Sequence, residues 1–368
     1  MDDWNFCQQT LPKVSRTFAL NISVLKGELH RSVLTAYLFC RIVDTVEDAA
    51  KLEPKVKIRL LLQFSKLIQD AESRSQQLSQ WVQDCAAVDG SASDLELLMQ
   101  TPRVFRVFDT LKANHRAQII HSVAQMAQGM AFFQGKFTAN EITLLKDEEE
   151  LEEYCYFVAG AIGEMLSNLF IEELPGLSDR NREIMQAHAV SFGLGLQMTN
   201  ISKDILADRG RGWSYIPRSF ITEKGLTVEE FNTGVSEKMN LEILERLLHK
   251  TTGHLQDALK FTLAIPKSES SIRIFCIWPL WIALETVATL HNNEALLKSD
   301  DPVKISRQTV RKILRRTRLL VHSDTLLKWS FSRIQKRARL LNPPVFRLHK
   351  LKSRLEDLNL NSSATLNA

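Results

Sequence analysis

Apolar residues recur every three or four positions through most of this 368-residue chain. Two of the clearest series are Val33, Tyr37, Cys40 and Val43, and Ile119, Val123, Met126 and Met130. This spacing puts the apolar side chains on one face of a helix, so it predicts amphipathic or buried helices. No segment alternates apolar and polar residues over more than a few positions, and there is no internal repeat. The pattern predicts an all-α fold.

The helix breakers are scarce, with 14 Gly and 10 Pro, about half of the usual share. Four stretches read as loops: residues 86–94, 175–179, 208–218 and 292–302. None of them is long or biased enough to be a domain linker. We therefore expect one domain over residues 1–340, followed by a basic and then polar tail over 341–368 that is partly disordered.

The charge is unevenly distributed along the chain. The net charge is only +4, but residues 301–368 hold 16 Lys and Arg against 4 Asp and Glu, so they carry +12 and the preceding residues carry −8. With 44% hydrophobic and 24% charged residues, the composition is that of a globular protein and excludes a disordered or collagen-like chain. An acidic body joined to a basic end indicates an anionic partner for the end, and nothing in the balance indicates nucleic acid.

The cysteines favour a reducing compartment. There are five, widely spaced and without a C-x-x-C pair, so neither a zinc site nor a disulfide framework is expected. The first residues, MDDWNFCQQT, lack the apolar core of a signal peptide. The longest apolar run, residues 274–284, contains Pro279 and is too short to span a bilayer. We expect a cytoplasmic protein.

The first informative acidic segment is Arg41-Ile-Val-Asp44-Thr-Val-Glu47-Asp48. On a helix, Asp44 and Asp48 are one turn apart and Glu47 lies beside them, so the three carboxylates share a face. Hard divalent cations such as Mg²⁺ take oxygen ligands of this kind and complete their shell with water or phosphate. Taken alone, the segment can equally be a solvated acidic face.

A second segment has the same character. Gln197, Asn200, Asp204 and Asp208 are spaced so that one helix face presents two amides and two carboxylates. The apolar, small-residue stretch before them favours a buried helix, where such groups are costly unless they are paired or metal-bound. Two such helices facing each other would clamp Mg²⁺ and a diphosphate. Arg16, Arg41, Arg209 and Arg211 lie beside the acidic or neighbouring motifs and offer forked donors for phosphate, although each can also be a surface residue.

Four segments together resemble a known family. They are Val14-Ser-Arg-Thr-Phe18, Asp44-Thr-Val-Glu-Asp48, Tyr154-Cys-Tyr-Phe-Val-Ala-Gly-Ala-Ile-Gly163 and Asn200-Ile-Ser-Lys-Asp-Ile-Leu-Ala-Asp208. In this order they are similar to the squalene/phytoene synthase family of head-to-head prenyl transferases, over roughly residues 10–310. The form of residues 44–48 and the segments 275–279, 283–290 and 303–307 look most like the squalene-forming farnesyl-diphosphate farnesyltransferases, of the bacterial type without a membrane anchor.

The resemblance implies an all-α isoprenoid-synthase fold with a central cavity, Mg²⁺ (or Mn²⁺) and NADPH as cofactors, and two farnesyl diphosphates as substrates. These would condense to presqualene diphosphate, which is then reduced to squalene. By family analogy the metal is held by Asp44, Glu47, Asp48, Asn200, Asp204 and Asp208, and the catalytic residues are Tyr154, Arg41 and the four aspartates. Substrate contacts are expected from Ser15, Arg16, Phe18, Tyr37, Arg41, Val158, Ala159, Gly163, Gln197, Asn200, Arg209, Arg211 and Phe275. NADPH phosphates are expected at Lys304 and Arg307.

Aromatic faces can stabilise the carbocations of this chemistry, and Phe18, Tyr37, Phe275 and Trp278 are the candidates. Alternatives remain for other positions: Tyr154 can be a core tyrosine, and Val158, Ala159 and Gly163 can be helix-packing residues.

Two departures from the family pattern bear on the function. Lys203 stands where Arg is expected, and Leu280 follows Pro279 where squalene-forming members commonly have Gln. A presqualene diphosphate, dehydrosqualene or phytoene synthase therefore stays open as an alternative function. A different class, a non-catalytic helical adaptor that binds membrane or RNA, would lack acids in either segment, and both segments are intact.

The basic end has a helical stripe of its own, formed by Arg307, Arg311, Arg315 and Arg318. Such a helix can lie on an anionic membrane surface, or it can be a solvated face that packs partly on the acidic body. We expect peripheral contact with the inner membrane face, no nucleic-acid partner, and a monomer.

Overall fold

The structure is a computed structural model that describes residues 2–138, 141–298, 303–340 and 343–358. These residues are almost entirely helical, and the only β structure among them is one parallel pair of two-residue strands. The predicted all-α fold is therefore confirmed. Packing divides the chain into two compact units, which are described separately. The prediction of a single domain over residues 1–340 stays a prediction.

Unit 1 comprises residues 1–137, 164–173 and 349–368. Its elements are α1 (Asp3–Val14), α2 (Arg16–Ile22), α3 (Gly27–Asp48), α4 (Pro54–Gln69), α5 (Ala71–Asp84), the short 3-10 helix η1 (Cys85–Ala87), α6 (Ala92–Met99), α7 (Thr101–Asp109), α8 (Ala113–Gln134), most of α10 (Ala161–Glu172) and α20 (Leu348–Asp357).

The core of unit 1 is aromatic. The ring of Phe39 on α3 packs against those of Phe64, Phe105 and Phe108, with centroid separations of 4.7–5.9 Å. The apolar series predicted for α3 and α8 lie on buried faces, with only Tyr37 half-buried. These side chains fix α3, and with it the first acidic segment at its C-terminal end.

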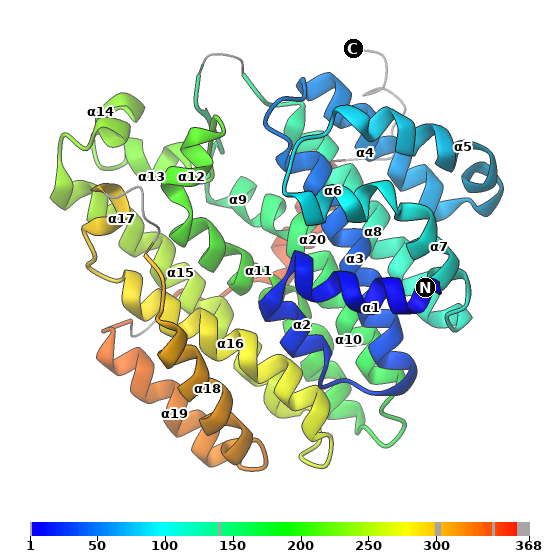
Figure 1. The fold of residues 1–368 in the computed structure, drawn as a ribbon. Helices are drawn as coiled ribbons and strands as arrows, with labels where there is room; N and C mark the ends of the chain where they lie inside the picture. Colours follow the sequence, from blue (N-terminus) through cyan, green and yellow to red (C-terminus); the bar gives the residue numbers. More distant parts are fainter. Residues whose placement is uncertain (1, 139–140, 299–302, 341–342, 359–368) are drawn as a thin grey trace. The chain divides into compact units, whose positions relative to one another are not determined.

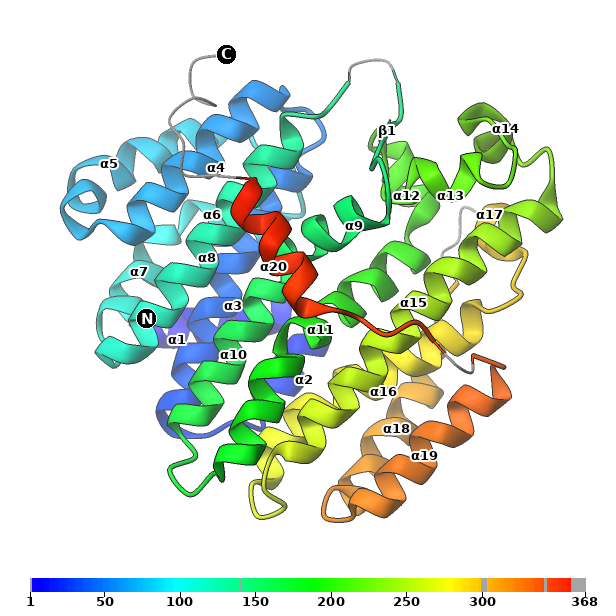
Figure 2. The ribbon, with the colours of Figure 1, turned by 180° about the vertical axis from the view of Figure 1, so that it is seen from behind.

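Helix α20 was not anticipated by the sequence, which predicted a tail from residue 341. In the structure residues Leu348–Asp357 form α20 (Figure 2), where Lys352 Nζ donates to Glu164 Oε1 near the start of α10 at 2.7 Å and Leu351 is fully buried. The polar end, residues 359–368, which was predicted to be disordered, lies outside the described residues.

Unit 2 comprises residues 138–163 and 174–348. Its elements are β1 (Thr143–Leu144), α9 (Glu148–Cys155), the π-helical turn η2 (Tyr156–Gly160), α11 (Asp179–Lys203), α12 (Ile205–Gly210), β2 (Trp213–Ser214), α13 (Arg218–Thr222), α14 (Val228–Thr233), α15 (Glu237–Ala264), α16 (Ser270–Leu290), α17 (Ala295–Lys298), α18 (Arg307–Leu320) and α19 (Asp324–Arg337).

Unit 2 is built mainly from long helices that pack against one another. α11, α15 and α16 run side by side, and α18 and α19 form a hairpin against α16 (Figure 1). Three of the four predicted loops contain structure. Residues 86–94 overlap η1 and the start of α6, and residues 208–218 contain the end of α12 and β2. The fourth predicted loop contains α17, and its residues 299–302 lie outside the described part of the chain.

Two helical stretches, Glu148–Glu172 and Ser270–Leu290, are long and apolar enough to cross a membrane by length and composition. The apolar run 274–284, which was judged too short to span a bilayer, lies within this longer helix, because α16 extends on both sides of the run. Within the apolar 18-residue window of each stretch, 61% and 67% respectively is buried by neighbouring protein. This is the burial that packing gives to a core helix.

Candidate active site

The first acidic segment ends α3 and leaves two carboxylates accessible. Asp44 is partly buried and Asp48, one turn later, is exposed, whereas the Glu47 side chain is buried. Burial, and then the negative charge of Asp48, raise the pKa of Asp44 to about 7. A carboxyl so crowded is stabilised in its charged form by an added cation. Asp44 and Asp48 are thus the pair in unit 1 that can face a metal ion.

Arg41, one turn before Asp44, is engaged by a residue that the sequence analysis did not single out. Its Nε and Nη2 donate to the two carboxylate oxygens of Asp94 on α6 at 2.7 and 2.8 Å. Burial alone would raise the pKa of Asp94, but hydrogen bonds from Arg41 and Ser91 hold it below its usual value. This bidentate pair fixes the direction of the guanidinium. It leaves the Arg41 side chain 31% exposed, so a ligand can still reach it.

The segment Val14–Phe18 lies close to Tyr37 of α3 in the same unit. Ser15 caps α2, with its Oγ accepting from the Phe18 backbone N–H at 3.2 Å. The rings of Phe18 and Tyr37 are 4.9 Å apart, and Phe18 is 38% exposed. Burial raises the pKa of Tyr37 to about 12, so its hydroxyl stays protonated. Arg16 is exposed. The structure therefore groups an accessible aromatic pair with the cations and carboxylates of α2 and α3.

The second acidic segment departs from the single straight helix that the spacing predicted. α11 ends at Lys203, and Asp204 has φ −104° and ψ 19°, outside the helical region, before α12 begins. Backbone hydrogen bonds from Asp204 N to Asn200 O and from Asp208 N to Asp204 O, both 2.9 Å, still span the break.

The carboxylates and the amide of this segment differ in exposure. Asn200 is exposed, Asp204 is partly buried and Asp208 is buried, with Arg211 Nη2 at 2.5 Å from its Oδ1. The prediction that one helix carries all four groups was therefore wrong, because Asp204 separates α11 from α12. The polar groups become more buried along the chain, from Asn200 to Asp208. Lys203 Nζ lies 3.1 Å from the carboxylate of Asp204.

Arg209 is a half-buried cation with two buried, unused donors. Within the described part of the chain, its Nε and Nη2 are buried and have no hydrogen-bond acceptor. The guanidinium lies 4.7 Å from the centroid of the Phe231 ring, and burial lowers its pKa to about 10. Buried guanidinium donors without acceptors are costly unless an anion supplies them. The donor set next to Asp208 therefore fits phosphate oxygens.

Tyr154 stands at the end of α9 in an aromatic stack. Its ring centroid lies 4.5 Å from that of Tyr215 at an interplanar angle of 21°, and the rings of Trp213 and Tyr215 are stacked at 5.8 Å. Tyr154 is only 4% exposed. The stack orients the tyrosine ring, which is what a group acting at a defined point of a reaction needs.

Glycines hold η2 and the first residues of α10 against α11 at very short range. A Cβ on Gly193 would come within 2.2 Å of the Ala159 carbonyl oxygen, and one on Gly163 within 2.3 Å of the Ala189 carbonyl oxygen. Gly163 is thus a helix-packing residue, which was one of the two sequence alternatives. Val158 and Ala159 are partly buried, as is Gln197 on α11.

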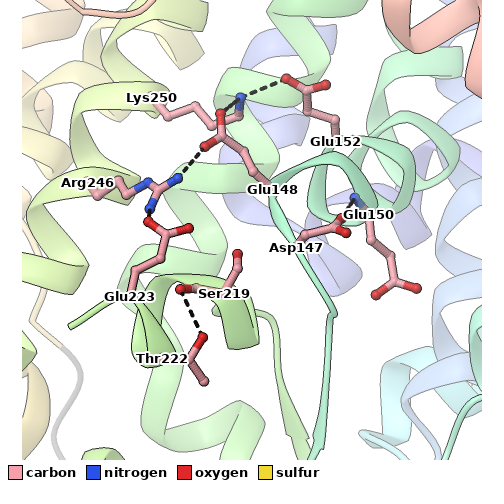
Figure 3. A network of polar contacts seen from close by, with 9 residues as sticks. All are labelled: Asp147, Glu148, Glu150, Glu152, Ser219, Thr222, Glu223, Arg246 and Lys250. Atoms are coloured by element: carbon pink, nitrogen blue, oxygen red, sulfur yellow. Dashed lines mark hydrogen bonds and ion pairs between the residues drawn. The ribbon is translucent and has the colours of Figure 1, made fainter. Parts of the chain in front are cut away.

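A network of charged side chains holds the start of α9, the helix that carries Tyr154 near its end (Figure 3). Lys250 on α15 is 7% exposed, and its Nζ contacts Glu148 and Glu152, each at 2.7 Å. Arg246, one turn earlier, bridges Glu148 and Glu223. Burial alone would lower the pKa of Lys250, but Glu152 and Glu148 hold it above its usual value. A lysine that is charged and buried thus ties α9 to α15.

The aromatic candidates on α16 are buried. Phe275 is 7% exposed and Trp278 is 3% exposed, with the guanidinium of Arg318 5.2 Å from the indole centroid of Trp278. Trp278 therefore has a cation from α18 against one face already.

Lys304 and Arg307, predicted to contact NADPH, are both exposed. Lys304 lines a cavity of about 800 Å³ between α16, α18 and α19, and Arg307 is not among the lining residues. The other charged side chains of this cavity are Glu285, Lys312, Arg316, Arg333 and Arg337. Glu285 is the one acid in this set, and it is paired with Arg337. The cavity is therefore large enough and cationic enough for a phosphate-bearing ligand.

Among the described residues no three His, Cys, Asp or Glu side chains gather into a metal-binding group. The donor sets are instead pairs of carboxylates, one on α3 and one on α11 and α12. Mg²⁺ commonly uses one or two carboxylates and completes its octahedral shell with water and substrate phosphates. In unit 1 the crowded Asp44 with Asp48 fits a metal–diphosphate ligand of this kind. In unit 2 the acids of α11 and α12 with the unused donors of Arg209 do so as well.

Three residues that contact Arg41, Tyr154 or the start of α9 were not predicted from the sequence: Asp94, Tyr215 and Lys250. Each acts through a partner far away in the chain, so local spacing gave no signal for Asp94 or Lys250. Tyr215 lies in the short run Trp213-Ser-Tyr-Ile-Pro217, directly after the second acidic segment. Aromatic residues next to that segment were the only available sign.

Comparisons with known proteins show which family the chain is similar to. The family model for squalene/phytoene synthase matches residues 11–309. Squalene synthase 1 of Arabidopsis thaliana is 30% identical over 86% of this chain and 72% of its own length. Squalene synthase of Eremothecium gossypii is 28% identical over 93% of this chain and 74% of its own length. The solved complex of TcSQS with the ligand BPH1237 has a TM-score of 0.73 at 24% identity and covers 92% of this chain and 97% of its own, which shows the fold.

Proposed function

Since the chain belongs to the squalene/phytoene synthase family, we propose that it is a squalene synthase, a farnesyl-diphosphate farnesyltransferase that also performs the reductive step. It would condense two farnesyl diphosphates to presqualene diphosphate, with loss of diphosphate and a proton. It would then convert this product to squalene with loss of the second diphosphate and gain of a hydride. The observation that carries the proposal is the crowded pair Asp44 and Asp48, in the squalene-type form of the segment, beside Arg41.

Two cofactors fit the residues present. Asp44 and Asp48, and Asn200, Asp204 and Asp208, would hold Mg²⁺, which supplies charge neutralisation to the departing diphosphate. The exposed Lys304, with Arg307, would hold the phosphates of NADPH, which supplies the hydride. The basic cavity that Lys304 lines supports this placement.

The chain's own residues have distinct tasks in this reaction. Arg209 has unused donors for diphosphate oxygens, and Arg41 is aimed by its pairing with Asp94. Preorganised donors of this kind favour the charge that develops on the leaving diphosphate. Phe18 and Tyr37 offer aromatic faces to a carbocation. Tyr154, oriented by its stack, would accept or direct the proton that is lost.

One departure favours a second candidate function. Leu280 is fully buried on α16, at a position where squalene-forming members commonly have Gln. A polar group that helped the reductive step would be missing there. The alternative is a synthase that stops at presqualene diphosphate or forms dehydrosqualene or phytoene.

Product analysis separates the two functions. Purified protein is incubated with farnesyl diphosphate and Mg²⁺, with and without NADPH. The proposed squalene synthase forms presqualene diphosphate without NADPH and squalene only with it. A dehydrosqualene product that NADPH does not change would refute the reductive step while keeping the family chemistry.

Two substitutions test the metal sites. Asp44→Asn and Asp204→Asn should each lower kcat by at least about 100-fold, because metal assistance supplies several kcal/mol of transition-state stabilisation. The melting temperature of Asp44→Asn should stay equal or rise, since the change relieves like-charge crowding. Glu229→Gln, at an exposed acid on α14, is the matched control and should keep full activity. Activity retained in both test variants contradicts the metal sites.

We further propose that the chain works as a monomer in the cytoplasm. All five cysteines are free and buried, which agrees with a reducing compartment.

A further inference from the structure

The hairpin of α18 and α19 exposes large apolar side chains at its closed end. Residues 321–323 join the two helices (Figure 1). Next to this turn, Leu319 is 83% exposed, Leu326 is 46% exposed and Trp329 is 53% exposed. Isolated exposed apolar residues are ordinary, but a contiguous group of them marks an interaction surface.

Contacts show that these residues share one face of the hairpin. The guanidinium groups of Arg316 on α18 and Arg333 on α19 lie 5.8 and 5.6 Å from the Trp329 ring. Leu319 follows Arg316 by three positions, and Leu326 precedes Trp329 by three, so each lies one turn away on the same side of its helix. Leu319, Leu326 and Trp329 therefore form one patch, here called the hairpin tip, with an arginine on either side of the tryptophan.

The surroundings of the hairpin tip are strongly basic. Residues 303–340 contain twelve Lys and Arg and a single acid, Asp324. That acid is already bound, with Arg273 Nη2 at 2.6 Å and Lys267 Nζ at 3.4 Å from its oxygens. Three more exposed cations, Arg315, Arg318 and Lys328, lie within one turn of the tip residues and have no carboxylate partner in the described part of the chain.

We propose that the hairpin tip docks this protein on an anionic phospholipid bilayer, with Leu319, Leu326 and Trp329 entering the headgroup region. Tryptophan and leucine beside arginine and lysine are the side chains that lie stably at such an interface, because the rings and chains leave water while the cations meet lipid phosphates. The proposal goes beyond the enzymatic function and needs none of its chemistry.

The charge of the surface decides between possible occupants. A second copy of this chain would bring a hairpin of the same high positive charge against this one, which costs free energy. A nucleic acid would satisfy the arginines but would leave the apolar tip in water. A bilayer with negative headgroups satisfies both. The basic stripe predicted from sequence is thereby refined, because only its last members, Arg315 and Arg318, lie close to the tip.

Co-sedimentation with phospholipid vesicles tests the proposal. The unmodified chain should bind vesicles of phosphatidylcholine mixed with phosphatidylglycerol, bind pure phosphatidylcholine vesicles weakly, and be released by high salt. Arg315→Glu with Lys328→Glu, at two exposed cations that do not line the basic cavity, should weaken binding about 25-fold or more, since each basic residue near an anionic surface is worth about a factor of five. Leu319→Glu with Trp329→Glu should reduce binding at least tenfold at unchanged salt.

The matched control is Val235→Glu, an apolar residue that is 69% exposed outside the basic hairpin. It should bind vesicles like the unmodified chain. Circular dichroism and turnover of farnesyl diphosphate in detergent solution should be the same in all variants, which separates failure of docking from failure of the enzyme. Equal binding to neutral vesicles, an equal loss in Val235→Glu, or a dimer that only Leu319→Glu with Trp329→Glu dissociates would each overturn the proposal.

Discussion

Replacement of Lys250 by methionine tests whether the charged network of Figure 3 holds α9 in place. Methionine keeps the length of the side chain and removes the charge. The Lys250 side chain is 8% exposed and that of Glu152 is 13% exposed, so the substitution removes a cation that lies 2.7 Å from a nearly buried carboxylate. Glu148 is 31% exposed and stays paired with Arg246, so it loses less stabilising interaction than Glu152 when Lys250 is replaced.

The expected cost follows from these exposures. Removing one partner of a buried ion pair typically costs about 3–5 kcal/mol, because the other charge stays behind unpaired. With Glu152 slightly accessible to water, we expect the low end, about 3 kcal/mol of unfolding free energy. Removing the charge of Glu152 as well should restore much of the lost free energy of unfolding. Lys250→Met with Glu152→Gln should therefore cost about 2 kcal/mol less than Lys250→Met alone.

Urea unfolding followed by circular dichroism measures these differences. The control is Lys260→Met on the same helix, whose side chain is 60% exposed and paired with Asp257, and which should change stability by less than about 1 kcal/mol. In turnover assays Lys250→Met should lower kcat more than it changes KM, since α9 carries Tyr154. The reasoning is refuted if Lys250→Met is as stable as Lys260→Met, or if Glu152→Gln brings no recovery.

The packing of unit 2 leads to three further predictions. Gly193→Ala should destabilise the protein by about 3 kcal/mol, because the new Cβ meets a carbonyl oxygen at 2.2 Å, whereas Gly176→Ala, with nothing within 4 Å, should be neutral in the same urea titration. Burial lowers the pKa of His254 from 6.5 to about 3. Between these two pH values the unfolded chain binds a proton at this histidine and the folded chain does not. The free energy of unfolding should therefore fall as the pH drops from 6.5 to about 3, by up to about 1.4 kcal/mol per pH unit. His254→Gln should flatten that part of the pH profile of unfolding, and an unchanged profile would contradict the assignment. Tyr215→Ala removes the ring that stacks on Tyr154 and should lower kcat about tenfold, since such pairs are worth about 0.5–1.5 kcal/mol; unchanged kcat would mean that the stack has no part in catalysis.

The helices and the acidic segments could be predicted because their signals are local. Residues on one face of a helix are three or four positions apart, so Val33 and Val43 on α3 were correctly predicted to lie on a buried stripe. The accessible pair Asp44 and Asp48 follows from the same geometry. The family likeness rested on short segments whose order along the chain is itself the signal, and the family match confirms it.

The rest depended on partners far apart in the chain or on backbone detail. Arg41 and Asp94 are 53 positions apart, so no local rule announces that the arginine is engaged. Asp204 interrupts α11 although its spacing from Asn200 and Asp208 is helical. Helical propensity cannot reveal such a break, because tertiary packing overrides it. The burial of Asp208 just after the break is part of that packing.

The π-helical turn η2, between Tyr154 and Gly163, has a consequence for how this stretch can change. In an uninterrupted α-helix, residues nine positions apart point in nearly opposite directions. A π turn accommodates one more residue per turn, so it rotates the next helical residues by about 100° relative to α-helical phase. That rotation lets Gly163 meet α11 while Tyr154 meets Tyr215. A single-residue insertion or deletion between residues 156 and 160 would therefore re-aim the tyrosine without altering any side chain, a kind of variation that a comparison of residue types alone would overlook.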